Sequence, residues 1–373
     1  MEVELKGASL DFLLLRPYVP TRLPRYAVRA DVCSDAPELR MCENMFPAGN
    51  KMKVAIAGAG MTGAYLFKLL KDAGCDVDIY DVSLRTQCGL TSCAWGTSRD
   101  FAELVEACGL NPQKYIFKKL HHVFIDHVRV PADLMTFDKP ALIKDLLSGA
   151  KVKCSAIDLS MYQRVIDATG VARAFLPKID DDIILRCVQR RIRSDDPLEN
   201  RIKLGDIGYA WCFPLEEDSY HVGCGSLLAD PDRILEKLSW TSGPSQLLIC
   251  ACAGKIRVTG PHGAQPFVVN SASGAVWGVG EAIGCVAPLA GDGIVPGMKS
   301  VRILLNNWDD PKGYSRAVLQ EFGWMRNERA VIDKLRRSGR LSFRDALVLK
   351  RNSRRMGMRI GLREAALLLR NLA

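Results

Sequence analysis

The chain has 373 residues, of which 48% are apolar and 25% charged, as in a globular protein large enough for two domains. No stretch reaches the roughly 18 consecutive apolar residues of a membrane span, so we expect a soluble or peripheral cytoplasmic protein. The formal net charge of +9 is concentrated near the end, where residues 313–373 carry 15 Lys and Arg against 5 Asp and Glu. This tail predicts an anionic partner.

The thirteen cysteines do not predict a disulfide framework, because their number is odd and the chain is not small. A reducing cytosol is the better interpretation. Four of them stand in apolar contexts and are expected to be small buried hydrophobes: Cys75, Cys187, Cys224 and Cys285. Cys250 and Cys252 lack the spacing of metal ligands, and we predict no metal site.

Residues 1–51 show no sustained periodicity and are expected to be an extension or linker. From Met52 onward, the apolar pattern alternates between strands and helices. We expect strands at 53–57, 76–80, 115–130, 165–168 and 276–280, and helices at 62–73, 101–109, 139–147, 232–238, 245–253 and 294–306. Strand-like periods dominate between 183 and 252. The chain beyond Pro311 is predicted to be helical and basic.

A glycine-rich turn follows the first predicted strand and opens the first helix. Its sequence is Gly-Ala-Gly-Met-Thr-Gly, and Asp81 ends the next strand about twenty residues later. In a dinucleotide-binding βαβ unit, the glycines permit the turn, the approach of phosphate and close helix packing. The helix N-terminus attracts the pyrophosphate, and the acid binds the ribose. Asp81 suits FAD or NAD, and the other predicted cofactor contacts are Gly58, Gly60, Met61, Thr62 and Gly63.

Two later segments favour FAD. The turn Ala168-Thr169-Gly170 resembles the one beside the adenine half in FAD proteins of the glutathione-reductase type, although it also fits an ordinary strand end. The segment 277–294 resembles the second flavin fingerprint of those proteins, in which an acid binds the ribityl hydroxyls and a helix start faces the flavin. The matching positions are Gly280, Glu281, Gly291, Asp292, Gly293 and Ile294, with Glu281 where Asp is usual.

An aromatic segment indicates a family. The residues Tyr209, Trp211, Phe213 and Pro214, followed by Gly223 and Gly225, resemble the Tyr-x-Trp-x-Phe-Pro…Gly-x-Gly signature of the geranylgeranyl reductase family. The pair Cys88-Gly89 resembles that family's Cys-Gly after the ribose-binding acid, and the match runs from about Met52 to Asn306. The aromatic alternation also fits a buried core face.

The resemblance implies an FAD enzyme of the archaeal digeranylgeranylglycerophospholipid reductase kind. Such an enzyme saturates C=C bonds of polyprenyl chains in membrane ether lipids by hydride transfer from reduced FAD. The aromatic side chains would line the substrate cavity, and Gly223 and Gly225 would leave room beside them. Cys88 is the first candidate for the proton donor and Tyr209 the second. Without a second Gly-x-Gly-x-x-Gly, the electron donor would be transiently bound NAD(P)H or a ferredoxin-like protein.

The fold class expected from these patterns is α/β. It comprises a Rossmann-like FAD-binding domain of glutathione-reductase type (52–180 plus 268–310), an inserted antiparallel-sheet substrate domain (181–267) and basic C-terminal helices (311–373). The tail either packs as a solvated helical face on the flavin domain or rests on an anionic membrane surface. Nucleic-acid binding is disfavoured, because no aromatic-basic recognition motif accompanies the charge.

Two other functions fit the same motifs. A flavin-dependent monooxygenase acting on an aromatic or apolar substrate shares the architecture and both FAD fingerprints. A non-catalytic flavin electron carrier or membrane scaffold also fits, because Asp81 and Glu281 depart from the usual residues. The aromatic signature and the Cys-Gly pair favour the reductase.

Overall fold

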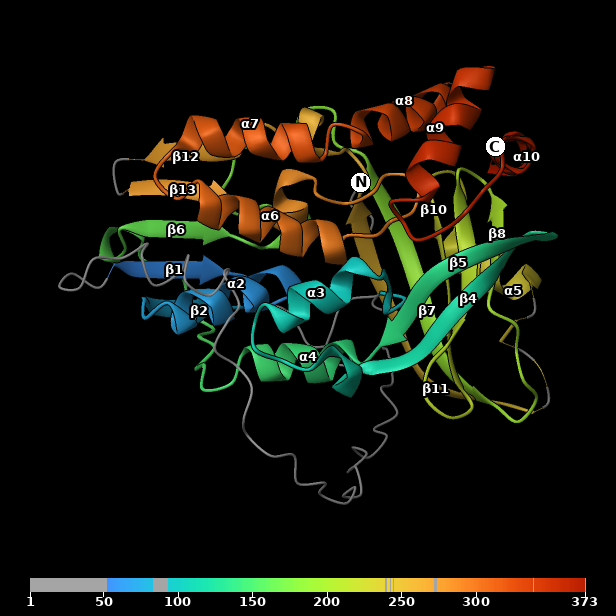
Figure 1. Cartoon of the computed structure of the whole chain (residues 1–373), viewed down its shortest axis with the longest axis horizontal. Coiled ribbons are helices and arrows are strands. Elements are labelled where there is room, and N and C mark those ends of the chain that lie inside the picture. Colours follow the sequence, from blue (N-terminus) through green and yellow to red (C-terminus); the bar gives the residue numbers. More distant parts are fainter. Residues whose placement is uncertain are drawn as a thin grey trace, which may run out of the picture. The chain divides into compact units, whose positions relative to one another are not determined.

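A five-stranded sheet, at the left of Figure 1, contains four parallel strands and one antiparallel edge strand. The computed structural model describes residues 52–82, 93–238, 240–241, 243, 245–271, 274–337 and 339–372. The strand order is β12-β13-β6-β1-β2, with β1 at Lys53–Ala57, β2 at Asp76–Tyr80, β6 at Arg164–Asp167, β12 at Val268–Ser271 and β13 at Gly274–Gly278. The last four residues of β1 are all buried, as expected for a central parallel strand covered by helices.

The helices that share an apolar core with this sheet include α2 (Met61–Asp72), α3 (Asp100–Glu106), α4 (Lys139–Leu146), α6 (Ile294–Asn306) and α7 (Pro311–Glu321). Helices α2 and α6 approach closely, because a Cβ added to Gly297 of α6 would lie only 2.4 Å from Thr62 Oγ1. The Tyr314 hydroxyl of α7 donates to the Gly278 carbonyl at 2.6 Å. The packing therefore brings the first turns of α2 and α6 to the same region of the sheet.

The second sheet has eight strands in the order β11-β7-β10-β9-β8-β4-β5-β3 (right of Figure 1). The strands are β3 (Gly96–Ser98), β4 (Ile116–Ile125), β5 (Val128–Phe137), β7 (Ile184–Ser194), β8 (Arg201–Gly205), β9 (Gly208–Pro214), β10 (Ser219–Ser226) and β11 (Gln246–Arg257). Its pairs are antiparallel except β4 with β8. Because β3, β4 and β5 belong to this sheet, the two sheets do not follow the boundary expected at residue 181.

The C-terminal segment is helical, as predicted, with α8 (Met325–Arg336), α9 (Phe343–Ser353) and α10 (Leu362–Leu372). These three helices share an apolar core with the second sheet, next to which they lie in Figure 1. The Ile207 N–H donates to the Leu372 carbonyl at 2.9 Å, which ties the end of α10 to the start of β9. Of the two alternatives for the tail, packing on the flavin domain applies to α7 and to the start of α8, whose Met325 is buried in the core of the first sheet, whereas α9 and α10 pack on the second sheet.

In the first sheet, the strands predicted at 53–57 and 76–80 have the expected bounds, and those predicted at 165–168 and 276–280 begin one and two residues earlier. The predicted helix at 245–253 is wrong. That segment belongs to β11, which pairs with β7 along its length. A short apolar run fits either a helix or a strand by pattern alone, and here hydrogen bonding to β7 decides. The remaining short elements are helix α5 (Pro231–Leu238) and the 3-10 helices Pro112–Lys114, Leu159–Met161, Gly170–Ala172, Pro261–Gly263 and Gly280–Ile283.

Candidate functional site

The Gly58–Gly63 turn joins β1 to α2 and packs against the turn that ends β6. Gly58 has a φ of +104°, and a Cβ there would lie 2.3 Å from the Ala168 carbonyl oxygen. A Cβ on Gly63 would lie 1.9 Å from the Gly58 carbonyl oxygen, whereas one on Gly60 would meet no described atom within 4 Å. Packing thus requires the first and third glycines, and the second keeps a space open. A dinucleotide pyrophosphate needs this arrangement.

Polar groups suited to a dinucleotide surround this space. Helix α2 begins after Gly60, which offers no side-chain cap, so N–H groups of its first turn can donate hydrogen bonds to an anion. Asp81 accepts a hydrogen bond from the Ala59 N–H at 2.9 Å, which places its carboxylate at the turn. Thr62 packs against the second fingerprint, because a Cβ on Gly280 would lie 2.7 Å from Thr62 Oγ1. The first fingerprint thus touches the second.

The Ala168–Gly170 turn is fixed by the buried carboxylate of Asp167. One oxygen of this carboxylate accepts from the Thr169 N–H at 3.0 Å and from the Thr169 hydroxyl at 2.6 Å. The other accepts from the Phe175 N–H at 2.9 Å. The Thr169 hydroxyl is therefore committed to the turn, and Ala168 lies beside Gly58. The cofactor contacts expected of Ala168, Thr169 and Gly170 stay predictions.

Glu281 joins the second fingerprint to this turn. Its carboxylate accepts from the Arg257 backbone N–H at 2.7 Å, and its other oxygen would lie 3.2 Å from a Cβ on Gly170. Burial raises the pKa of Glu281 to about 7, while the hydrogen bond and positive charge of Arg257 oppose the rise. A carboxyl group with this pKa exchanges a proton near neutral pH.

The turn before α6 carries a second carboxyl group and meets the aromatic strand. Asp292 accepts from the Ile294 N–H at 3.0 Å, and burial raises the pKa of Asp292 to about 6. The Tyr209 hydroxyl of β9 donates to the Ala290 carbonyl, and a Cβ on Gly291 would lie 2.9 Å from that hydroxyl. Burial also raises the pKa of the Tyr209 phenol well above its usual range. The structure therefore brings Tyr209 of the aromatic segment to the Gly291 turn of the second fingerprint.

The rest of the aromatic strand is packed more tightly than expected. Trp211 is only 5% exposed, and its indole N–H donates to Gln189 at 3.3 Å. A Cβ on Gly223 would lie 2.2 Å from the Trp211 ring, and one on Gly225 would lie 2.8 Å from Leu185. The expectation that these glycines leave room for a substrate is therefore wrong, because side chains of the protein fill that room.

Phe213 and Pro214 lie where β9 approaches β3 and β5. A Cβ on Gly96 of β3 would be 3.7 Å from the Phe213 ring. The Pro214 carbonyl accepts from the Thr136 hydroxyl of β5 at 2.7 Å. Both Phe213 and Tyr209 are half-buried, unlike Trp211, so the ends of the aromatic strand remain candidates for substrate contact.

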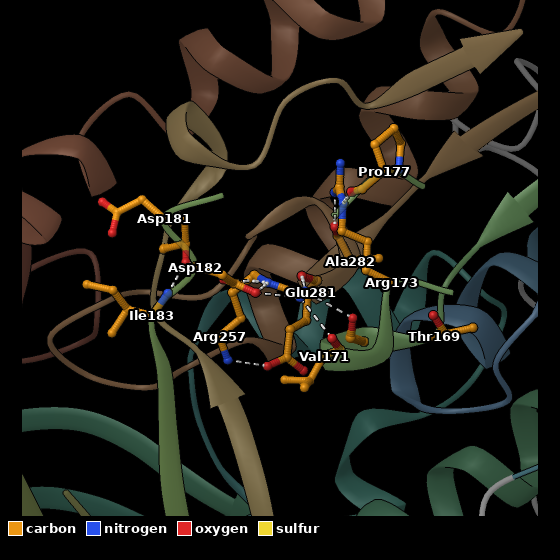
Figure 2. Close-up of polar contacts among 12 residues, drawn as sticks. Thr169, Val171, Arg173, Pro177, Asp181, Asp182, Ile183, Arg257, Glu281 and Ala282 are labelled. Carbon is orange, nitrogen blue, oxygen red and sulfur yellow. Dashed lines mark hydrogen bonds and ion pairs between the residues drawn. The ribbon is translucent and has the colours of Figure 1, made fainter. Parts of the chain in front are cut away.

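Sequence reasoning missed Arg257, which binds both turns of the site (Figure 2). Its guanidinium donates to the carbonyls of Gly170 at 3.1 Å, Glu281 at 2.9 Å and Val171 at 2.8 Å. It also forms an ion pair of 3.0 Å with Asp182. Arg257 is 3% exposed, so these contacts offset the cost of burying its charge. No local pattern links it to Asp182, which lies 75 residues earlier.

A second buried arginine, Arg173, holds the same region from the other side (Figure 2). Its guanidinium donates to the carbonyls of Pro177 at 2.6 Å, Pro266 at 2.8 Å and Ala282. Burial, and then the nearby charge of Arg257, lower the pKa of Arg173 to about 10. The two arginines are positioning residues that fix the second fingerprint against the turn after β6.

Two predicted site residues, Cys88 and Gly89, lie outside the described residues. Within the described part of the chain, no helix is long and apolar enough to cross a membrane. The same part contains no cluster of three or more His, Cys, Asp or Glu side chains that could hold a metal ion. Two cavities lie away from the glycine turn: one of about 140 Å³ beside His262 and Arg329, and one of about 690 Å³ beside Arg99 and Arg354.

No family model matches the chain. A curated relative, an uncharacterised protein of Methanocaldococcus jannaschii, is 24% identical over 339 residues, which cover 78% of this chain and 92% of that protein. Among solved structures, a geranylgeranyl bacteriochlorophyll reductase-like protein from Thermoplasma acidophilum matches with a TM-score of 0.62 and 16% identity. That match covers 76% of this chain and 88% of the other.

Two further solved structures have the same fold. A flavin-dependent halogenase matches with a TM-score of 0.54 and 16% identity over 76% of this chain and 64% of its own. A probable FAD-dependent monooxygenase from Pseudomonas aeruginosa matches with a TM-score of 0.51 and 16% identity over 77% of this chain and 97% of its own. The predicted fold class is thereby confirmed: the chain has the Rossmann-type fold of FAD-dependent oxidoreductases.

Proposed function

We propose that the chain binds FAD across its two fingerprints and is an FAD-dependent reductase that saturates C=C bonds of polyprenyl chains. One contact carries this proposal: the Tyr209 hydroxyl on the Ala290 carbonyl, beside Gly291. This contact places the aromatic strand against the turn that begins α6. A cofactor ring at that turn would therefore lie next to aromatic side chains that suit an apolar substrate.

The residues of both fingerprints fit the two halves of FAD. The open space at Gly60 and the start of α2 suit the pyrophosphate, and Asp81 suits the adenosine ribose. Glu281 and the start of α6 at Ile294 suit the ribityl chain and the flavin ring. When bound and reduced, FAD supplies a hydride equivalent.

The protein contributes orientation, exclusion of water and control of protons. Tyr209 and Phe213 would orient an apolar chain and keep water from it. Burial raises the pKa of Glu281 to about 7 and that of Asp292 to about 6, so each carboxyl group can exchange a proton in the range just below neutral pH. The Tyr209 hydroxyl already donates to a carbonyl, which favours a positioning role for it. Cys88 and Tyr209 as proton donors stay predictions.

The partners are part of the same proposal. Electrons would come from NAD(P)H or a ferredoxin-like protein. The lipid would reach the cytoplasmic enzyme from an anionic membrane surface next to α9 and α10. Exposed apolar side chains on these helices support that approach, with Phe343 64% and Leu367 48% exposed beside basic residues.

A flavin-dependent monooxygenase is the second candidate, because a halogenase and a monooxygenase also share the fold. The two functions differ in what accepts electrons from the reduced flavin. A reductase passes them to carbon, whereas a monooxygenase requires oxygen and leaves an oxygen atom in its product.

The test uses the full chain loaded with FAD, reduced by dithionite without oxygen and mixed with a geranylgeranyl phospholipid. Mass spectrometry should find lipid that has gained one or more pairs of hydrogen atoms, and protein without FAD is the control. Unchanged lipid, together with a hydroxylated product when air and an aromatic substrate are supplied, would establish the monooxygenase instead. Flavin that passes electrons but changes neither substrate would indicate an electron carrier.

A further inference from the structure

A large basic pocket lies outside the two fingerprints. Its volume is about 690 Å³, which is within the range of small-molecule sites. Its walls are the end of β3, the middle of β5 and the loop between α9 and α10. The lining includes four basic side chains and one acid: Arg99, Lys350, Arg354, Arg359 and Asp133.

Backbone pairing fixes the walls of this basic pocket. Strand β3 ends at Ser98, and beyond it the α9–α10 loop pairs with the same edge of β5. The Asp133 N–H donates to the Gly357 carbonyl at 2.6 Å, and the Arg359 N–H donates to the Pro131 carbonyl at 2.9 Å. The basic residues are therefore carried by backbone that is tied to the sheet.

The positive charges of the basic pocket are largely unneutralised. Arg99 lies at the long distance of 3.9 Å from Asp100. Lys350, Arg354 and Arg359 form no ion pair with any described residue. Like charges around one space repel each other, and a bound anion relieves that repulsion.

Strand β3 connects the basic pocket to the aromatic strand. Gly96 lies against the Phe213 ring, and Arg99 follows three residues later. At 3.3 Å per residue, this separation is about 10 Å along the strand. The basic pocket and the Phe213 ring therefore lie near the two ends of the same short strand.

We propose that the basic pocket binds a phosphate ester, and that this ester is the polar end of a polyprenyl lipid. The identity of the lipid rests on the proposed function, which supplies the apolar chain. An arginine guanidinium group binds two phosphate oxygens through two parallel N–H groups, and Arg354 and Arg359 both lie in the loop between α9 and α10.

The FAD-loaded full chain is titrated with a geranylgeranylglycerol phosphate, with the same lipid lacking phosphate, and with glycerol phosphate. The variant R354Q/R359Q is compared with R351Q/R370Q, which removes two charges from exposed positions of α9 and α10 outside the pocket. We expect R354Q/R359Q to raise the Kd of the phosphorylated lipid about 30-fold or more, and R351Q/R370Q to change it by less than about threefold. The lipid without phosphate should bind all three proteins equally, and the melting temperatures should agree.

If both double variants lost equal affinity for the phosphorylated lipid, the binding would be a general attraction to negative charge, and the assignment of the basic pocket as the phosphate site would be wrong. Glycerol phosphate that binds as tightly as the phosphorylated lipid would overturn the lipid assignment in favour of a soluble ester. The readout is binding, so it is independent of catalysis. If the lipid binds in an arginine-dependent way but is never reduced, only the proposed reductase function is wrong. If the lipid is reduced and its Kd is unchanged in R354Q/R359Q, only the assignment of the basic pocket is wrong.

Discussion

Replacing Gly60 with alanine should separate cofactor binding from folding. Gly60 has a φ of −71° and a ψ of −173°, which alanine adopts without strain, and its new Cβ would meet no described atom within 4 Å. We therefore expect the free energy of unfolding to change by less than about 1 kcal/mol. A bound pyrophosphate would occupy that space, and overpacking by a methyl group costs about 1–3 kcal/mol. The Kd for FAD should then rise about 5- to 150-fold.

The assay combines urea unfolding of FAD-free protein with titration of FAD followed by its fluorescence. Gly63→Ala is the matched contrast, because its Cβ would lie 1.9 Å from the Gly58 carbonyl oxygen, a backbone atom that cannot yield easily. This variant should lose at least about 2 kcal/mol of stability before any ligand is added. Unchanged FAD affinity in Gly60→Ala would refute the hypothesis that the pyrophosphate occupies the space beside Gly60. Wild-type stability in Gly63→Ala would refute the inference that packing requires a glycine at position 63.

Three further substitutions test the packing and the buried charges. Arg257→Met should lower the free energy of unfolding by about 3 kcal/mol, because Asp182 and three carbonyls lose their partner; a loss below about 1 kcal/mol in urea would contradict this. Gly223→Ala should cost about 1–3 kcal/mol, because its Cβ would lie 2.2 Å from the Trp211 ring, and wild-type thermal stability would show that the strand has room after all. Burial raises the pKa of Glu328 to about 7, so the stability that the protonated side chain contributes is present below about pH 4.5 and lost as the pH rises through 7. Relative to wild type, Glu328→Gln should therefore gain roughly 3 kcal/mol in free energy of unfolding between pH 4.5 and 8, measured in urea. Parallel pH profiles of the two proteins would exclude this.

The dinucleotide unit could be predicted from the sequence because its signals are local. The strands at 53–57 and 76–80 and the helix at 294–306 have the predicted bounds. A buried strand, a glycine turn and an amphipathic helix follow one another within thirty residues, so each pattern supports the next. The roles expected of Gly58, Gly60 and Gly63 agree with the space around each glycine.

The second sheet and the buried arginines could not be predicted because they depend on distant partners. Strand β11 was predicted as a helix, since a Leu-Leu-Ile run has no period of its own and only pairing with β7 defines it. Arg257 and Asp182 are far apart in sequence, and nothing near either residue indicates the other. The contact of Gly223 with Trp211 likewise depends on the register between β10 and β9. Pairing and register between distant strands thus determine structure that local secondary-structure propensity does not specify.

An equilibrium titration of the FAD-free chain with FAD, FMN and NAD tests directly whether the chain binds FAD across its two fingerprints. We predict one FAD per chain and much weaker binding of FMN, which lacks the adenosine half that Asp81 and the turn at Gly60 would hold. We also predict weaker binding of NAD, which offers no flavin ring to the turn before α6. No saturable binding of FAD would contradict the assignment of both fingerprints, and tighter binding of NAD would contradict the assignment of the second.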